Sequence, residues 1–463
     1  MSARNELAQI WRAAGLDQTA LTQIDVRDTP QCLPSSFNVG TAAQTSIAAA
    51  ALAAESMYHL RSGAHQIVSV DRNAAELECT GYFKVDGTAP NAWEKFSGLY
   101  EAADGYVRIH ANFEHHRDGV LELLELGPAA SVEHDDVARA LSKWSALDFE
   151  SAAAQRSLVV AMVRSFDTWD AHPHAIASRD GALVNITRIG EGQPTQPSTI
   201  DPSARPLTDI KVLDLTRILA GPICGRTLAA YGADVMLVNS PRLPNISSII
   251  DTSRGKRSVH LELTDAADAA TMQSLVRDAH VFVQGYRPGG LADLGFSPQQ
   301  LALLHPGIVC VSLSAYGSEG PWSGRRGFDS LVQTVAGFNH AEAEAAGSST
   351  PKSLPVPILD YASGFLMAFG AQAALLRQAV EGGSWHVEVS LLQTANWLRR
   401  MGRLESGLRI SPPSIKEFLA EFPCQEGRLE AMPHAALFSD TPALWVRPSA
   451  PPGSHAPSWD DQR

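Results

Sequence analysis

Basic side chains stand at several points of an otherwise acidic chain, each close to an apolar segment, and their placement is the first hint of chemistry. Three arginines come just after predicted strands, and three more bases stand close together in the segment SRGKRS; the six are Arg217, Arg242, Arg287, Arg254, Lys256 and Arg257. Bases gathered in this way are typical of a site for a polyanionic ligand. Solvated loop charges are the alternative that the residues alone leave open.

The common phosphate-binding motifs are missing from the positions where they would be expected. The segment after the first predicted strand reads LDLTRILAGPICG, in which Gly221 and Gly225 do not form G-x-G-x-x-G and a proline stands between them. The pattern G-x-x-x-x-G-K-[ST] is also absent. An NAD site is therefore weakly supported, although a nucleotide-like ligand is still expected at the carboxyl ends of the strands.

Histidines and aromatic residues provide weaker signals. His110, His115, His116, His172 and His174 cluster loosely without the spacing of metal ligands, so we expect solvated loop histidines and no metal site.

Two tyrosines follow predicted strand ends, where an adenine or an acyl group could pack against them. Tyr286 and Tyr316, the latter followed by Gly317, are equally compatible with a place in the core. Trp93 and Trp169 are expected to be packing residues.

The elements that must position these residues alternate between strand and helix patterns. Short apolar runs at 210–215, 234–238, 280–284 and 308–314 predict strands, and the helical patterns lie between them. Continuous apolar strands separated by helices indicate an α/β fold with a doubly wound, mostly parallel, Rossmann-like sheet.

The region before this sheet reads as a smaller mixed α+β domain. It contains an alanine-rich helix at 42–60 and a hairpin at 98–111 whose turn is Asp104-Gly105. A proline-rich linker follows. We therefore predict four segments: the mixed domain at 1–190, the linker at 191–206, a ligand-binding domain at 207–400 and a proline-rich tail at 401–463 that wraps over a surface.

Composition excludes several classes of function. The 463 residues contain 37 basic and 50 acidic side chains, a formal charge of −13, which argues against nucleic acid or an anionic membrane as partner. No apolar run reaches the roughly 18 residues that span a bilayer. The N-terminus lacks the pattern of an export signal, and the five scattered cysteines show no C-x-x-C spacing. We expect a cytoplasmic protein with reduced thiols.

Several motifs occur in an order that is specific to one family. The segments VLDLTRILAGPICGRTLAAYGADVMLVNSP, GKRSVHLEL, VFVQGYRPGGLADLGFSP, LSAYGSEGPWSGRRGFD and LDYASGFLMAFGAQAALL follow one another between 211 and 397. Together they resemble the class III CoA-transferase family. The N-terminal segments GLYEAADGYVRIHANFEHH and FDTWDAHPHAIAS resemble parts that lie after the catalytic half in that family, so the order looks permuted or duplicated.

The resemblance implies that Asp360 is a catalytic carboxylate. A carboxylate that attacks an acyl-CoA gives a mixed anhydride, and the released thiolate then forms an aspartyl-CoA thioester that hands CoA to a second acid. From the residues alone, a helix N-cap is an equally natural reading of Asp360. The CoA contacts expected on this basis are Arg217, Ala220, Arg242, Arg254, Lys256, Arg257, Tyr286, Arg287, Tyr316 and Gly317.

The same resemblance implies CoA and acyl-CoA as substrates, a small carboxylic acid as acceptor, no tightly bound cofactor and an interlocked homodimer. An internal echo accompanies it: an alanine-rich helix precedes Gly63 as another precedes Gly382, with valines at equal offsets beyond each. The position that corresponds to Asp360 in the first copy is Thr41. One active site per chain is therefore expected.

Two alternatives remain. Racemases of the family resemble one another in a G-H-D segment, and here that segment reads Gly327-Phe328-Asp329. Phenylalanine cannot move protons, which favours CoA transfer over racemisation and leaves Asp329 a structural residue. An acyl-CoA isomerase, racemase or lyase of the same fold is the first alternative. A CoA-binding homologue without activity is the second alternative.

Overall fold

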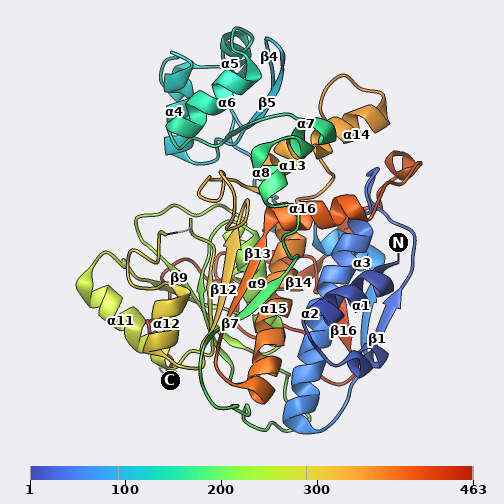
Figure 1. Ribbon diagram of the computed structural model, residues 1–463, viewed down its shortest axis with the longest axis vertical. Coiled ribbons are helices and arrows are strands. Elements are labelled where there is room, and N and C mark those ends of the chain that lie inside the picture. Colours follow the sequence, from blue (N-terminus) through green and yellow to red (C-terminus); the bar gives the residue numbers. More distant parts are fainter. Residues whose placement is uncertain (1, 92, 288, 461–463) are drawn as a thin grey trace.

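A parallel sheet is the largest element of the protein, whose computed structural model describes residues 2–91, 93–287 and 289–460 (Figure 1). Within these residues the sheet has seven strands, and only the last in the spatial order is antiparallel. In that order they are β10 (Arg257–His260), β9 (Asp234–Asn239), β8 (Lys211–Leu215), β11 (Val281–Gln284), β12 (Val309–Ser314), β13 (Ser384–Ser390) and β7 (Asn185–Gly190).

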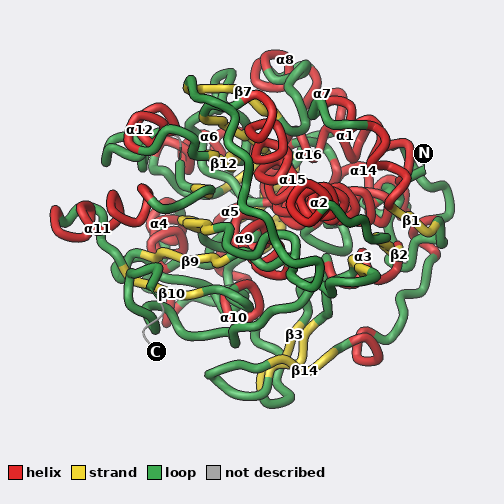
Figure 2. Tube along the Cα trace, turned by 90° about the horizontal axis from the view of Figure 1, so that it is seen from below, coloured by secondary structure: helices red, strands yellow, loops and turns green. Residues whose placement is uncertain are grey.

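Both faces of this sheet are buried, which explains why its strands are continuous apolar runs. Along β8, Val212 points into the core that contains α9 (Ala220–Ala230) and α15 (Ile358–Glu381), while Leu213 joins the opposite core. That opposite core contains α11 (Ala266–Arg277) and α12 (Pro298–Leu304). Figure 2 shows these helix pairs on the two sides of the strands. The predicted doubly wound α/β fold is confirmed.

The strands predicted at 210–215, 234–238, 280–284 and 308–314 correspond to β8, β9, β11 and β12. Sequence reasoning missed β10 and treated its basic first residues as a loop. The remaining helices of this half are α10 (Ile249–Thr252), α13 (Asp329–Val335), α14 (Phe338–Ala346) and α16 (Leu391–Arg400).

A smaller unit, residues 98–162, stands above the carboxyl ends of the main strands (Figure 1). It joins the sheet β4 (Gly98–Ala102), β5 (Gly105–Ile109) and β6 (Val160–Met162) to α4 (Glu114–Leu123), η2 (Ala129–Ser131), α5 (His134–Leu141) and α6 (Ala146–Gln155). The unit has an apolar core of its own. The hairpin predicted at 98–111 is confirmed as β4 and β5, which pair from Gly98 with Ile109 to Ala102 with Gly105.

The N-terminal segment packs onto the main half. Its long helix α2 (Val39–Ser62) lies along α15, and Gln372 of α15 donates a hydrogen bond to the Ala50 carbonyl of α2 at 3.1 Å. The other elements of this region are α1 (Ala3–Ala13), η1 (Gln18–Gln23), β1 (Ile24–Arg27), β2 (Val68–Asp71), α3 (Arg72–Glu78), β3 (Phe83–Val85), α7 (Phe166–Asp170) and α8 (Pro173–Ala177).

The C-terminal segment crosses the surface of both regions. Its elements are η3 (Gly407–Arg409), η4 (Ile415–Phe418), β14 (Ala420–Phe422), β15 (Leu429–Ala431) and β16 (Ala436–Phe438). The strand β16 pairs with β2, and β15 pairs with β3. The last three residues of the predicted tail, 461–463, lie outside the described residues.

One apolar core runs across the predicted boundary at 191–206. It contains Leu52 of α2 together with Val212 of β8 and Leu366 of α15, and β7 extends the main sheet from the N-terminal side of that boundary. The division into separate domains stays a prediction.

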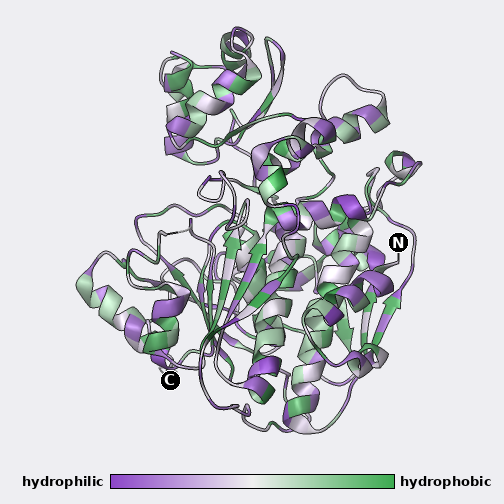
Figure 3. Ribbon diagram, in the orientation of Figure 1, coloured by the Kyte–Doolittle hydropathy of each residue, from purple (hydrophilic) through white to green (hydrophobic). Residues whose placement is uncertain are grey.

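The helix α15 is long and apolar enough to match a membrane span by length and composition, but 94% of its most apolar window is buried inside the protein. The strands beside it are largely green in Figure 3, the colour of apolar residues. This helix is therefore the central core helix. Its first turn lies at the carboxyl edge of the sheet.

Candidate functional site

Asp360 lies in the first turn of α15, which begins at Ile358 after Pro357. The carboxylate that caps this helix is Asp329, at the start of α13, whose Oδ2 accepts hydrogen bonds from Leu359 N at 2.8 Å and Asp360 N at 3.1 Å. The alternative of Asp360 as the N-cap is therefore wrong. Asp329 has the structural role that we expected, and the side chain of Asp360 is left available.

The pKa values of both carboxyl groups are raised, and Asp329 contributes to the raised pKa of Asp360. Burial raises the pKa of Asp329 to about 6, against the hydrogen bonds from Asp360 N, Gln333 and Leu359 N that favour its charge. Burial and then the neighbouring Asp329 raise the pKa of Asp360 well above its ordinary range. Because Asp329 accepts the helix amides and Asp360 does not, the shared negative charge resides mainly on Asp329.

Asp360 opens onto a cavity of about 890 Å³. The cavity is lined by residues from four regions: 80–83 with 89–91 and 93–94, 108–112, 218–219 with 245–251, and 328–333 with 353–361. The first two regions lie far before Asp360 in the chain, so the site is built by the N-terminal half and the main sheet together. Sequence reasoning found Asp360 but none of the residues that the N-terminal half contributes.

His110 is the nearest counterpart to the histidine that the segment at 327–329 lacks. Its ring is stacked on that of Phe328 at 4.2 Å between centroids, and Trp93 meets it edge-on at 5.6 Å. Burial, followed by Arg108 and His116, lowers the pKa of His110 to about 3, so the imidazole is neutral.

The expectation of solvated loop histidines is wrong for His110, His116 and His174, which are buried. Trp169 is a packing residue as expected, whereas Trp93 is 44% exposed and lines the cavity. The placement of these side chains depends on how the small unit lies over the sheet, and a local sequence pattern does not predict that arrangement.

The turn after β8 carries backbone strain beside the cavity. Ile218 has a φ of 76°, a left-handed conformation that a β-branched residue rarely adopts. Its carbonyl accepts a hydrogen bond from Ser248 Oγ at 3.2 Å. Strain of this kind is found mainly where a surrounding structure imposes it for a ligand or a reaction.

The same turn lies at the switch point of the sheet. From β8 the chain adds strands first on one side, β9 and β10, and then on the other, β11 to β13. Ligands of open α/β sheets bind outside the carboxyl ends of the strands at such a point. Arg217 follows β8 and Tyr286 follows β11, so the two lie on either side of this crevice.

Arg217 belongs to a group of cations beneath α4. Arg326 contacts His116 at 3.1 Å, and Arg217 lies 5.4 Å from the ring centroid of Phe113. Burial and the neighbouring Arg326 and Arg217 lower the pKa of His115, and burial, His115 and Arg326 lower that of His116 to about 3. Similarly, burial and Arg287 lower the pKa of Arg326.

Three buried nitrogen atoms of this group have no hydrogen-bond partner: Arg217 Nε, Arg326 Nε and His116 Nδ1. Among the residues that the structure describes, Arg217 donates to the Pro244 carbonyl and Arg326 contacts His116, and neither arginine pairs with a carboxylate. Buried donors without a partner are rare, and two of these three belong to guanidinium groups, so the cluster points to an anion that would accept from them. Arg326 was missed from the sequence because it lies twelve residues beyond the end of β12, whereas Arg217 lies only two beyond the end of β8.

The other predicted bases lie elsewhere. Arg242 is 76% exposed, 3.7 Å from Glu262. Lys256 is fully buried and donates to Asp214 Oδ2 and to Pro222 O, both at 2.8 Å. Arg257 pairs with Asp234 at 3.0 Å. The structure therefore does not bring these three to the group around Arg217, and their role in ligand binding stays a prediction.

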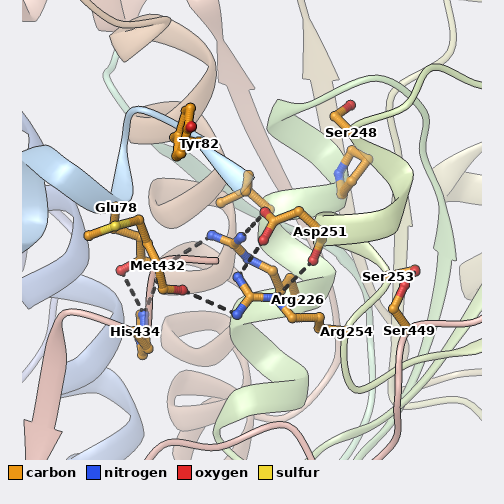
Figure 4. Close-up of polar contacts among 12 residues, drawn as sticks. Glu78, Tyr82, Arg226, Ser248, Asp251, Ser253, Arg254, Met432, His434 and Ser449 are labelled. Atoms are coloured by element: carbon orange, nitrogen blue, oxygen red, sulfur yellow. Dashed lines mark hydrogen bonds and ion pairs between the residues drawn. The ribbon is translucent and has the colours of Figure 1, made fainter. Parts of the chain in front are cut away.

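Arg254 belongs to a buried ionic network behind the cavity (Figure 4). Its guanidinium pairs with Asp251 at 2.5 Å and donates to the Met432 carbonyl at 3.2 Å. Arg226 lies between Asp251 and Glu78, and Glu78 also contacts His434 at 3.0 Å. The network joins α3, α9, α10 and the C-terminal segment, so it fixes the back wall of the cavity.

The remaining predicted residues line a second cavity or the core. Tyr286, Arg287, Tyr316 and Gly317 line a neighbouring cavity of about 500 Å³. Tyr316 is buried, and its carbonyl contacts His174 Nε2 at 3.0 Å.

Ala220 begins α9 and is buried where α9 meets α15. A Cβ added to Gly364 of α15 would lie 2.4 Å from the Ala220 carbonyl oxygen. Ala220 therefore helps to set the position of the first turn of α15 against the turn after β8.

Comparison with known proteins adds a family match. Residues 207–406 match the family model of CoA-transferase family III. An acyl-CoA transferase of Gibberella moniliformis is 29% identical over 359 residues, covering 73% of this chain and 62% of that protein. A succinate–glutarate CoA-transferase of Agrobacterium fabrum is 32% identical over 206 residues, covering 40% of this chain and 51% of that protein.

Among solved structures, the Mycobacterium tuberculosis protein Rv3272 in an orthorhombic crystal form is 31% identical. The match covers 42% of this chain and 58% of that one, with a TM-score of 0.40. The chain spans less than two thirds of the length of each of these relatives. The matched residues 207–406 include Asp360, Arg217 and Arg326 but not the small unit.

Proposed function

We propose, because the chain belongs to CoA-transferase family III through residues 207–406, that it transfers CoA from an acyl-CoA donor to a carboxylic acid through Asp360. The observation that carries this proposal is the position of Asp360. Its carboxyl group stands in the first turn of a core helix and opens onto a cavity of about 890 Å³ next to a group of unpaired cations.

The proposed reaction divides the transfer into steps with one bond made and one broken in each. An Asp360 oxygen attacks the thioester carbonyl of the donor, and the C–S bond breaks. CoA leaves as the thiolate, and the acyl group stays on Asp360 as a mixed anhydride. The thiolate attacks the Asp360 carbonyl carbon and releases the donor acid as a carboxylate. The aspartyl-CoA thioester then reacts with the acceptor acid by the reverse sequence.

The environment of Asp360 supports a nucleophile that is scarce but reactive. Burial and Asp329 raise its pKa, so the ionised fraction increases with pH. Burial also limits the hydration of the ionised carboxylate, which increases its reactivity toward a thioester.

The group of Arg217, Arg326, Arg287, His115 and His116 is the best candidate for the phosphates of CoA. It lies beneath α4 at the switch point of the sheet, and Arg217 immediately precedes two residues that line the Asp360 cavity. The second cavity, with Tyr286, Tyr316 and Gly317 in its walls, is a proposed place for other parts of the ligand. We keep Ala220, Arg242, Arg254, Lys256 and Arg257 as weaker candidates.

The names of two relatives favour a dicarboxylic acid among the small carboxylic acids, since both the Agrobacterium protein and its mouse counterpart are named for glutarate. We further propose a cytoplasmic homodimer without a tightly bound cofactor. Light scattering on the purified chain would test the dimer, which is overturned if the mass is that of one chain.

An acyl-CoA isomerase is the second candidate, and one observation favours it. His110 is stacked on Phe328 and lines the cavity of Asp360, so two groups able to exchange a proton face one space. This reaction would wash deuterium from the solvent into the α-carbon of an acyl-CoA without an acceptor acid. A CoA-binding protein without activity would show neither wash-in nor transfer.

Mass spectrometry of the intact protein tests the main proposal. Wild type and Asp360→Ala are incubated with a mixed acyl-CoA pool and then with hydroxylamine. We expect a mass increase of one CoA less one water on wild type, converted by hydroxylamine to the hydroxamate, and no increase on the variant. Bound CoA without any adduct on wild type would overturn the covalent mechanism.

A further inference from the structure

Arg108 is a buried cation in the wall of the Asp360 cavity. It lies on β5 of the small unit, between Leu99 of β4 and Ala161 of β6, and is 8% exposed. Its guanidinium stands 4.8 Å from the ring centroid of Trp93, and its NH1 group donates to Ser353 Oγ at 3.3 Å. Its Nε atom is buried and has no hydrogen-bond partner.

Besides Asp360, three carboxylates of the described lining face the same cavity, and each of the three is engaged by other groups. Both oxygens of Asp329 accept hydrogen bonds, from Gln333 and from the first turn of α15. Asp251 pairs with Arg226 and Arg254, and Glu94 accepts from the Phe96 amide at 2.7 Å. Within the described residues Arg108 therefore forms no ion pair, although Asp329 is near enough to offset part of the burial that lowers its pKa.

No other cation of the described lining competes with Arg108. The cavity contains no lysine and no second arginine among its described lining residues, and burial keeps the neighbouring His110 neutral, with a pKa of about 3. A buried guanidinium without a carboxylate partner is unfavourable, and an anionic ligand group would remove that cost. The planar donor fork of arginine matches a carboxylate in particular.

We infer that Arg108 binds a second, non-reacting carboxylate of the substrate and so selects dicarboxylic acids over monocarboxylic acids of the same length. The inference rests on the proposed function, in which the reacting carboxyl group is transferred at Asp360. One cavity then holds both ends of the acid: the reacting end at Asp360 and the distal end against Arg108 and Trp93.

A role for Arg108 confined to Asp329 makes a different prediction. In that case loss of the guanidinium would weaken the capping of α15 and slow the transfer of every acid equally. Selection of a distal carboxylate instead changes the ratio between two acids that differ in that group alone. The ratio is therefore the quantity to measure.

The experiment compares wild type, Arg108→Gln and Arg108→Lys with the control Arg139→Gln, an exposed arginine on α5 of the same unit. With one acyl-CoA donor, kcat/KM is measured for glutarate and valerate and for succinate and butyrate. Wild type and the control should prefer the dicarboxylate by about 10²-fold or more. In Arg108→Gln the preference should disappear, with the monocarboxylate changed by less than about threefold, and Arg108→Lys should recover part of it.

Two results would overturn the inference: no preference for dicarboxylates in wild type, or an equal loss for both acids in Arg108→Gln. Calorimetric titration of glutarate into the same proteins separates this failure from failure of the proposed function. If no acid is turned over but glutarate binds to wild type and the control and not to Arg108→Gln, transfer is wrong and the anion site stands. Absence of glutarate binding to wild type removes the site.

Discussion

Two arms of the molecule have the same succession of elements. Both α2 and α15 contain 24 residues and end at a glycine with positive φ, 73° at Gly63 and 70° at Gly382. Each helix leads into a strand, β2 or β13, and then into a helix capped by Asp71 or Ser390. The repeated helix–glycine–strand pattern of the sequence thus corresponds to a repeated succession of elements in the structure. The two long helices pack against each other.

The beginnings of the two helices differ. The first turn of α15 faces a cavity, whereas Thr41 in the first turn of α2 is 3% exposed. Asn38 at that end donates to the carbonyls of Met401 and Gly402 at 3.1 Å, and the Gly40 amide donates to Gln31 at 3.0 Å. Protein groups thus fill the space that a ligand would need, so helix architecture alone does not make a site.

The first arm uses its carboxylates to hold the chain together. Glu76 of α3 accepts from the amides of Cys32 and Leu33, and Glu78 contacts Arg226 and His434. Burial alone would raise the pKa of Glu78, but His434 and Arg226 hold it below the ordinary value. The carboxylates of the first arm therefore stabilise the fold, whereas the second arm carries the candidate reaction centre.

The largest effect is expected from Asp360→Asn. Transfer should fall by about 10³-fold or more because the nucleophile is lost. Adding Thr41→Asp to this variant should not restore activity, since the end of α2 is closed, and Thr41→Ala alone should leave the rate unchanged. Steady-state transfer assays on the three proteins check the comparison, and recovery of activity by the aspartate at 41 would contradict it.

The same variant should be at least as stable as wild type at neutral pH. The pKa of Asp360 is raised in the folded protein, so its contribution to stability is present below the ordinary pKa of an aspartate and is lost as the pH rises. Asparagine removes that loss. Thermal unfolding at pH 7 should give an equal or higher Tm for Asp360→Asn, and a clear decrease would contradict the raised pKa of Asp360.

Glu78→Gln should affect stability and leave the chemistry in place. Removing the carboxylate leaves Arg226 and Arg254 to share Asp251, which is expected to cost about 3–5 kcal/mol. Because the pKa of Glu78 is lowered, its contribution is present above the ordinary pKa of a glutamate and is lost as the pH falls below it. Denaturant unfolding should show a difference at pH 7 that shrinks below about pH 4.

Asp329→Asn tests the coupling at the first turn of α15. Asparagine still accepts a hydrogen bond from the helix amides but removes the charge that raises the pKa of Asp360. The rising limb of kcat/KM against pH should therefore move to lower pH by about one unit or more. An unchanged limb would show that Asp360 does not control the rate.

The smallest effect is expected from a substitution at the contact between α2 and α15, the long helices of the two arms. Gln372 donates to Ala50 and to Ala368, but its Oε1 atom is buried without a partner. Replacement by leucine of similar volume should change the free energy of unfolding by less than about 1.5 kcal/mol and leave transfer unaffected. A larger loss would mean that this hydrogen bond fixes the register of α2 on α15.

The sequence by itself determined the elements that depend on local patterns. Apolar runs predicted β8, β9, β11 and β12, and the Asp-Gly turn predicted the hairpin of β4 and β5. These features depend on residues close together in the chain, so a window of sequence contains their cause. The ordered motifs between 211 and 397 likewise indicated a resemblance to CoA-transferase family III, whose model matches residues 207–406.

Tertiary structure alone decided which charged side chains remain available. Lys256 and Arg257 form ion pairs with aspartates that lie 42 and 23 residues earlier in the chain. In contrast, the Nε atoms of Arg217, Arg326 and Arg108 have no hydrogen-bond partner. Arg108 and His110 line the same cavity as Asp360 because the small unit lies over the sheet. Burial and ion pairing depend on partners that are distant in the sequence. An arginine or lysine that is buried beside a carboxylate stabilises the fold, whereas one that is buried without a carboxylate is available to bind an anionic ligand.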